Sequence, residues 1–129
     1  MSLDILQAFQ TGQVFSAAQE ANVKDLPWHE HPKFQGVALK HLITAKDSDG
    51  QFSSHLVRVN HGCEIGTHIH EGKWELHEVL GGRGKCRIDQ KEVDYRAGVM
   101  AVIPADIPHV VAATESDLYI LAKFVPALL

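Results

Sequence analysis

The sequence predicts an all-β domain built as an antiparallel sandwich or barrel. From residue 36 onward, apolar and polar residues alternate with a period of two, in runs of five to eight residues. This is the pattern of strands that bury one face. Turn-forming residues separate the runs and leave hardly any room for a helix between them. Short strands at such spacing favour an antiparallel sandwich or barrel over alternating βαβ units.

Length and charge narrow the class of protein. A chain of 129 residues and 14.2 kDa has the size of one domain, so we expect a single hydrophobic core. A formal net charge of -4 offers no basic field to a phosphate backbone, which argues against a nucleic-acid partner. No apolar run approaches the roughly 18 residues of a membrane span. No secretory signal is visible either, so we expect a cytoplasmic protein without membrane association.

The histidine content directs attention to a metal. Nine histidines among 129 residues is roughly three times average usage, and imidazole is suited to metal binding and proton transfer. The two cysteines, Cys63 and Cys86, form no CxxC motif and are expected to remain reduced as small buried thiols. The compositional signal for a site therefore lies in the histidines.

Residues 1–35 are expected to form an N-terminal arm. Ser2 is a candidate N-cap for a short helix that begins near Leu3, with further apolar residues at helical spacing. An arm that pairs with a barrel edge or with a second subunit is an equally good interpretation. Residues 26–32 are bracketed by two prolines and are predicted to form a loop.

The barrel domain is expected to span residues 36–125, and residues 126–129 are expected to form a C-terminal tail. A strong turn at 46–50 and a glycine-rich hairpin turn at 81–84 punctuate the alternating pattern. Strands are predicted at 36–44, 52–59, 75–80, 85–89, 99–103, 109–113 and 118–125. Within the fifth of these runs, Met100 and Val102 are interpreted as core residues.

Candidate ligands lie in the middle of the sequence. In an extended strand His68 and His70 share one face, so both imidazoles can project into the barrel. A turn after His70 can bring back a neighbouring strand whose Glu75 faces the same interior. Two imidazoles and a carboxylate are a typical facial set for Fe(II), Mn, Ni, Co or Zn that leaves open coordination positions. His109 opens a later strand after a proline-containing turn and is a plausible third imidazole.

These residues resemble the two motifs of the cupin superfamily. The first, G(X)5HXH(X)3,4E(X)6G, is matched at every spacing, and the second, G(X)5PXG(X)2H(X)3N, is matched with two departures. Asp106 replaces a glycine, which is tolerable because Asp adopts left-handed backbone geometry more readily than most residues. Ala113 replaces the final Asn, a position that is not a ligand. The matching residues are Gly62, His68, His70, Glu75 and Gly82 in the first motif, and Gly98, Pro104 and His109 in the second.

The resemblance to a single-domain cupin implies a double-stranded β-helix, that is, a jelly-roll barrel. It also implies one divalent transition metal, of unspecified identity among Fe, Mn, Ni, Co and Zn. The ligands implied are His68, His70, Glu75 and His109. The flanking strands extend the resemblance over about residues 36–125.

The remaining histidines divide by strand parity. His77 follows Glu75 on the same strand and should face inward, so it is the candidate for acid/base work, with core packing as the alternative. His55 and His41 can line the barrel but are more simply explained as hydrogen-bonded structural residues. Trp74 should point away from the metal, toward a sheet contact or a subunit interface. Three histidines in predicted loops are expected to be exposed and uncommitted: His29, His31 and His61.

The leading functional hypothesis is a metal-dependent enzyme that acts on a small organic molecule inside the barrel. Dioxygenation and non-redox isomerase or lyase chemistry are both open, because one scaffold hosts many reactions. The alternative is a non-catalytic binding or sensing module in which the metal is structural. Resemblance to single-domain cupins and the apolar C-terminal end predict a homodimer.

Overall fold

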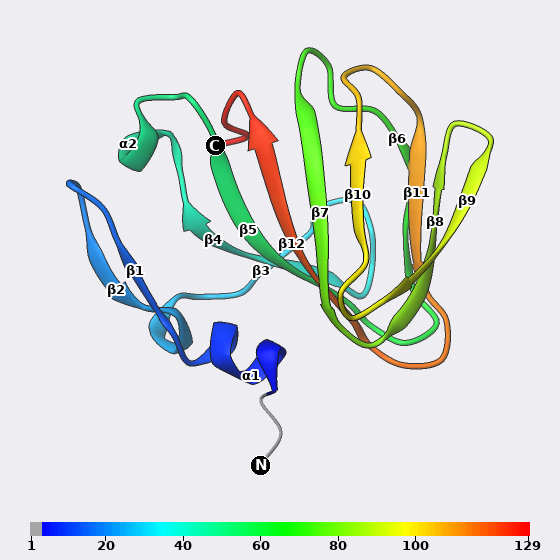
Figure 1. Ribbon diagram of the computed structural model, residues 1–129, viewed down its shortest axis with the longest axis horizontal. Coiled ribbons are helices and arrows are strands. Elements are labelled where there is room, and N and C mark those ends of the chain that lie inside the picture. The colour runs from blue at the N-terminus through cyan, green and yellow to red at the C-terminus, as the bar shows by residue number, and fades with distance from the viewer. Residues whose placement is uncertain (1–3) are drawn as a thin grey trace.

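The computed structural model describes residues 4–129 (Figure 1), and most of them lie in strands. The helical elements are short: α1 (Ile5–Gln10), the 3-10 turn η1 (Val23–Asp25) and α2 (Ala45–Ser48). The strands are β1 (Gln13–Phe15), β2 (Glu20–Asn22), β3 (His29–Glu30), β4 (Val37–Ile43), β5 (Ser53–Val59), β6 (Glu64–His68), β7 (Trp74–Gly81), β8 (Arg83–Ile88), β9 (Lys91–Arg96), β10 (Met100–Ile103), β11 (His109–Ala113) and β12 (Leu118–Val125).

Two antiparallel sheets face each other and form the barrel (Figure 1). One sheet has six strands in the order β10-β7-β12-β5-β4-β3, and the other has four in the order β6-β11-β8-β9. Consecutive strands often lie in opposite sheets, so the chain crosses repeatedly between the two layers, as in a jelly roll. The prediction of an all-β double-stranded β-helix is therefore confirmed.

Strand alternation builds the main core between the sheets. Inward-facing residues of β5, β7, β11 and β12 alternate with residues that face outward, which is the period-two pattern seen in the sequence. Cys86 is part of this core, and both Cys86 and Cys63 are free, as expected. The fully buried members of the core include Val37, Val59, Cys86, Tyr95, Val111 and Leu118.

The N-terminal segment covers the outer face of the six-stranded sheet. Helix α1 is capped by Asp4, whose side chain accepts a hydrogen bond from the Gln7 backbone N–H at 3.2 Å. The predicted cap Ser2 lies outside the described residues. Strands β1 and β2 form a hairpin that contributes to a second hydrophobic core on the outside of the barrel. The buried residues of this second core are Val14, Val23, Leu42, Leu56, Leu80 and Leu121.

A short helix forms in the N-terminal arm, as one interpretation predicted, whereas β1 and β2 pair with each other and with no barrel strand. Strand β3 lies within the predicted loop 26–32 and pairs with β4 at the edge of the six-stranded sheet. The expected turn at 46–50 is a single helical turn, α2, followed by Asp49 and Gly50 in left-handed geometry. Across residues 4–129, no helix is both long enough and apolar enough to cross a membrane.

One expectation about β10 was wrong, and one strand was not predicted. Met100 and Val102 are 68% and 57% exposed. They lie on the outer face of the edge strand β10, whereas the alternate residues Ala101 and Ile103 face the interior. Strand β9 was not predicted, since its charged residues mask the alternation. Its central position Tyr95 is nevertheless completely buried.

A histidine pair joins β4 to β5 inside the barrel, with His55 buried and His41 half-buried. His41 and His55 are register partners, and their Nδ1 atoms lie 2.8 Å apart, so one Nδ1–H donates to the other Nδ1. The Nε2 of His55 lies 2.8 Å from the Ser53 Oγ. Burial lowers the pKa of His55 to about 4, aided by the charge of His41 and opposed by that of Glu75. His55 is therefore a neutral structural residue at pH 7.

We expect acid to weaken the protein through His55. Its folded pKa lies below the unfolded value of about 6.5, so the unfolded chain binds the proton more tightly. The free energy of unfolding should fall as the pH drops from about 6.5 to about 4, by up to about 3 kcal/mol from this residue. Denaturant unfolding of the wild type and of His55→Leu across this range measures the effect. Some slope should persist in the variant, because the pKa of His68 is also lowered to about 4.

The control for this measurement is His61→Leu, which replaces an exposed histidine. It should leave the pH dependence of the wild type intact. Equal slopes for the wild type and His55→Leu would contradict the assignment.

Candidate metal centre

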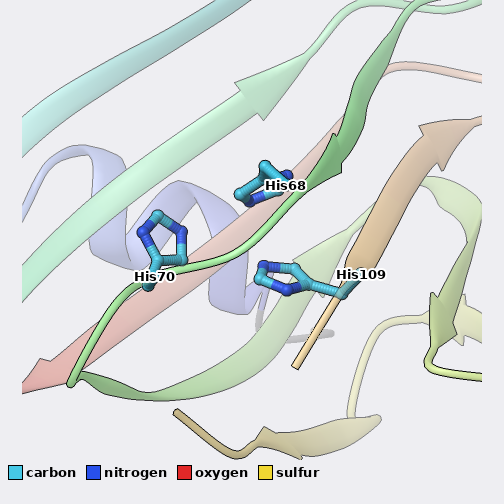
Figure 2. Close-up of side chains that lie close together, drawn as sticks. All are labelled: His68, His70 and His109. Carbon is cyan, nitrogen blue, oxygen red and sulfur yellow. The ribbon is translucent and has the colours of Figure 1, made fainter. Parts of the chain in front are cut away.

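The sequence-predicted ligands converge at one end of the barrel. His68 is the last residue of β6, His70 lies two residues further in the loop to β7, and His109 is the first residue of β11. Strands β6 and β11 are neighbours, and His68 is the register partner of His109. Figure 2 shows the three rings gathered around one point, although they come from different segments of the chain.

The three imidazoles form a compact donor set. One ring nitrogen from each of His68, His70 and His109 lies within 4.8 Å of the others. The ring centroids are 4.0 Å apart for His68 and His109, and 4.9 Å apart for His68 and His70. Such a group could hold a metal ion. The structure thus brings together the three histidines that the spacing predicted.

A pair of loops fixes this arrangement. The loop between β6 and β7 turns at Gly72, which has a φ of 70°, and the loop between β10 and β11 turns at Asp106, with a φ of 66°. Asp106 therefore adopts the left-handed geometry expected at the position where the cupin motif has glycine. Its Oδ1 accepts a hydrogen bond from the Gly72 N–H at 3.0 Å, and its own N–H donates to the His70 carbonyl at 3.3 Å. These bonds tie the two ligand-bearing loops together.

Backbone hydrogen bonds select the ring nitrogen that is free for a ligand. The Nδ1 of His68 lies 2.6 Å from the Gly66 carbonyl, and the Nδ1 of His109 lies 3.0 Å from the Ile107 carbonyl. A carbonyl only accepts, so each Nδ1 carries the proton and each Nε2 of a neutral ring presents a lone pair. Burial lowers the pKa of His68 to about 4 and also lowers the pKa of His70, which favours neutral rings at pH 7.

Glu75 places a carboxylate beside these rings. It lies on β7, is almost completely buried, and its Oε1 lies 3.2 Å from the Nε2 of His109 and 3.6 Å from the Nε2 of His70. Burial tends to raise the pKa of Glu75, but the charge of His77 and the hydrogen bond from its ring hold that pKa well below its usual range. Both Glu75 Oε1 and His109 Nε2 are buried without a hydrogen-bond partner.

Such orphaned polar atoms are costly unless something binds them. An anionic oxygen and a lone-pair nitrogen that face each other at this distance suit a cation between them. The residues present therefore fit a divalent ion, and the fit rests on this carboxylate together with the three imidazoles.

Behind Glu75 lies a second buried layer that sequence inspection found only in part. His77 Nε2 lies 2.8 Å from Glu75 Oε2, and His77 Nδ1 lies 2.8 Å from the Tyr95 hydroxyl oxygen. Burial tends to lower the pKa of His77, but the charge of Glu75 raises this pKa to about 9. The ring is therefore protonated at pH 7 and donates from both nitrogens. His77 faces inward as expected. Tyr95 was missed because its strand was missed.

The cavity beside the three histidines is small and mainly apolar. Its volume is about 80 Å³. Two larger hollows, of about 480 and 540 Å³, lie along the N-terminal arm, away from the clustered imidazoles. We assign the site to the small cavity because convergent polar groups, and not size, mark a binding site. Its lining is His31, Val37, Leu39, Val57, Ile65, His68, His70, Glu75, Ala122, Phe124 and Leu128.

The other singled-out residues take separate places. His31 is half-buried and lines the cavity, so the expectation of an uncommitted loop residue was wrong. His29 is exposed but stacks on His41, with 4.8 Å between ring centroids, whereas His61 is simply exposed. Trp74 is 52% exposed on the outer face, as its parity predicted. The tail residue Leu128 packs into the barrel core and is therefore not free surface.

Comparison with known proteins adds the family context. A model of the Cupin domain family matches residues 55–122, more than half of the chain. No curated protein sequence matches the chain.

Several solved structures share the fold at low sequence identity. A predicted oxalate decarboxylase from Thermotoga maritima is 22% identical over 80% of this chain and 95% of its own, with a TM-score of 0.73. An RmlC-like cupin from Shewanella frigidimarina is 16% identical over 84% of this chain and 90% of its own, with a TM-score of 0.72. Ectoine synthase from P. lautus is 20% identical over 73% of this chain and 67% of its own, with a TM-score of 0.65.

We expect Tyr95→Phe to destabilise the protein by about 1–3 kcal/mol, because it leaves the buried Nδ1–H of His77 without its acceptor. Chemical denaturation measures this loss. The matched control is Tyr119→Phe, which removes the hydroxyl of a half-buried tyrosine on the outer face and should cost less than 1 kcal/mol by the usual range for surface changes. Equal effects of the two substitutions would show that the Tyr95 hydroxyl does not support His77.

Proposed function

The chain belongs to the cupin family, and on that premise we propose that it is a metal-dependent enzyme acting on a small organic molecule inside the barrel. One observation carries the proposal: the buried carboxylate oxygen of Glu75 and the Nε2 of His109 face each other without partners beside two further imidazoles. Structural side chains normally satisfy their buried polar atoms. This arrangement is instead typical of ligands that a cation completes.

The proposed ligands are His68, His70, Glu75 and His109. Their chemistry suits Fe, Mn, Ni, Co or Zn, and the donor set does not choose among them, because affinity order and metal supply decide occupancy. A bound ion of this kind supplies Lewis-acid polarisation of a substrate oxygen or, if redox-active, a site for oxygen chemistry. Three nitrogens and one carboxylate leave room for an additional ligand from the cavity.

The protein's own residues orient the donors and exclude water. Apolar side chains from both sheets wall the cavity, which strengthens electrostatic interactions at its polar end. His77 lies behind Glu75 and is absent from the cavity lining. We therefore propose that it acts through Glu75, by fixing the direction of the carboxylate, while acid/base work by His77 stays a prediction. Ligands held in this way are pre-organised for binding.

The reaction class is proposed only broadly, as dioxygenase or as isomerase and lyase chemistry. Two of the structural relatives are named as a predicted oxalate decarboxylase and an ectoine synthase, which supports an enzyme over a binding module. The competing function is a small-molecule sensor with a structural metal. Thermal stability of apo and holo protein, measured together with turnover on a substrate panel, separates them. A protein that unfolds without metal and turns over nothing would be the binding module.

The metal proposal is tested by elemental analysis of protein purified without a histidine tag or chelator. We expect about one transition-metal ion per chain in the wild type. Glu75→Gln should lower the metal affinity by about 10–100-fold or more, since it removes the anionic donor while keeping the size of the side chain. His68→Ala should bind less than a tenth of the wild-type amount under the same conditions, a rough expectation for loss of one ligand.

His61→Ala is the control, because it removes an exposed histidine away from the centre. It should retain the full metal content. Metal content near zero in the wild type after reconstitution, or an unchanged content in His68→Ala, would refute the centre.

We further propose a homodimer, with residues 1–35 as an arm, 36–125 as the barrel and 126–129 as a tail. Support comes from apolar side chains on the outer face of the six-stranded sheet near its β10 edge, where Trp74 neighbours Val125 on β12. The exposed members of this outer patch are Trp74, Met100, Val102 and Val125. Patches of this kind usually meet a partner surface. The free cysteines support the cytoplasmic location, which cell fractionation would check.

Sedimentation analysis tests the dimer directly. The wild type should sediment with twice the mass of the chain, and Met100→Lys combined with Val102→Lys should shift it to the monomer. A wild-type monomer at micromolar concentration would contradict the proposal.

A further inference from the structure

His31 has no place in either cupin motif, yet it stands at the candidate metal centre. It lies between β3 and β4, and its backbone N–H donates to the Val37 carbonyl at 2.8 Å. Its Nδ1 accepts hydrogen bonds from the backbone N–H groups of Lys33 at 3.0 Å and Phe34 at 3.2 Å. The ring is thus anchored to its own loop through one edge.

These two bonds fix the protonation of the ring. A nitrogen that accepts from N–H groups carries no proton, so the proton of the neutral imidazole must be on Nε2. Burial, with a contribution from the charge of Lys33, lowers the pKa of His31, which keeps the ring neutral at pH 7. His31 therefore presents a single N–H donor, on the edge opposite to the two backbone amides.

Packing holds this donor at the cavity. The ring lies against Phe34, with 4.8 Å between centroids, and Phe34 in turn lies against His68 at 6.0 Å. Phe34 sits so close to Gly66 that a Cβ there would approach its Cε1 to 2.9 Å. His31 shares the cavity lining with His68, His70 and Glu75. The ring of His31 is therefore held at the cavity beside the candidate ligands, and Nε2–H is the donor that it can offer there.

The lining and charge of the cavity indicate which kind of ligand can accept a hydrogen bond from His31. Apart from His31 and the candidate ligands, its lining is aliphatic or aromatic, and its volume is only about 80 Å³, which favours a short molecule. With a divalent ion bound, only one of the four proposed ligands is anionic, so the polar end carries net positive charge. A short hydrocarbon group with one anionic end complements this space.

We propose that His31 is a specificity-determining residue that binds one oxygen of a small monocarboxylate, whose other oxygen is directed to the metal. This inference rests on the proposed metal centre. It commits the substrate class to short carboxylates with an apolar remainder, held at two points. A neutral N–H group donates a hydrogen bond to such an oxygen and keeps its own proton.

Two variants separate the donor from the loop anchor. In His31→Asn, the Oδ1 can replace Nδ1 as acceptor of the Lys33 and Phe34 amides, so the loop is preserved but the donor at the ε position is lost. In His31→Gln, the side-chain amide restores a donor near the ε position and gives up the anchor. If His31 only anchors the loop, His31→Gln should lower propanoate affinity more than His31→Asn. If His31 donates to the carboxylate, His31→Asn should lower that affinity more.

The probe is propanoate, titrated into Co(II)-loaded protein and followed by visible absorption. We expect the dissociation constant of propanoate to rise about tenfold in His31→Asn and to change by less than about threefold in His31→Gln, the effect of one hydrogen bond to a charged acceptor. The Co(II) affinity of both variants should stay within about twofold of the wild type, since His31 is not a proposed ligand.

A metal-free readout stands beside this titration. Nitrogen-15 NMR of the apo protein at pH 7 should show His31 as the neutral form protonated at Nε2. Protonation at Nδ1 would overturn the inference, as would an unchanged propanoate affinity in His31→Asn or no propanoate binding to Co(II)-loaded wild type. Failure of the wild type to bind Co(II) would overturn the metal centre and this inference together, so the two failures are distinguishable.

Discussion

The burial of one carboxylate, that of Glu75, constrains the rest of this site. Removing an ionised carboxylate from water costs several kcal/mol unless charges and hydrogen bonds compensate. Here, His77 approaches one oxygen at 2.8 Å, while the other oxygen faces His109 at 3.2 Å and has no hydrogen-bond partner. The contact with His77 stabilises the negative charge and fixes the orientation of the carboxylate. The oxygen that faces His109 remains without a hydrogen bond, and a bound cation would stabilise it.

The jelly-roll topology is what makes this carboxylate usable. Glu75 lies on β7, inside the six-stranded sheet, whereas His68 and His109 come from the facing sheet. The Asp106 to Gly72 hydrogen bond ties the loops at the end of the barrel where the ligands meet. Donors from both layers therefore converge without long flexible segments. This rigidity favours a pre-formed site over one that assembles around its ligand.

Most of the barrel and the histidine cluster could be predicted because both follow local rules. Period-two alternation predicted seven strands, and the two-residue spacing of His68 and His70 predicted that both side chains lie on the same face of a strand. The failures came where tertiary position overrides local pattern. The sequence around Tyr95 is rich in charge, so a strand that completes the barrel was missed. Met100 and Val102 are apolar but lie outward, because no local signal tells which face of an edge strand is covered.

The position of His31 at the cavity could not be predicted from the sequence either. It belongs to a segment that was expected to be an exposed loop, and only the pairing of β3 with β4 brings its ring to the cavity. Tyr95 likewise acquires its role through contact with His77, eighteen residues away in sequence. Ligands could be predicted from spacing, whereas the groups that orient ligands or meet the substrate depend on contacts between distant segments.

X-ray absorption spectroscopy of the metal-loaded protein would identify the atoms that bind the metal. We predict nitrogen and oxygen ligands at about 2.0–2.2 Å, with the multiple scattering of three imidazoles in the wild type and of two in His68→Ala. A shell that contains sulfur at about 2.3 Å would point to Cys63 or Cys86. That result, or a spectrum unchanged in His68→Ala, would contradict a centre built on His68, His70, Glu75 and His109.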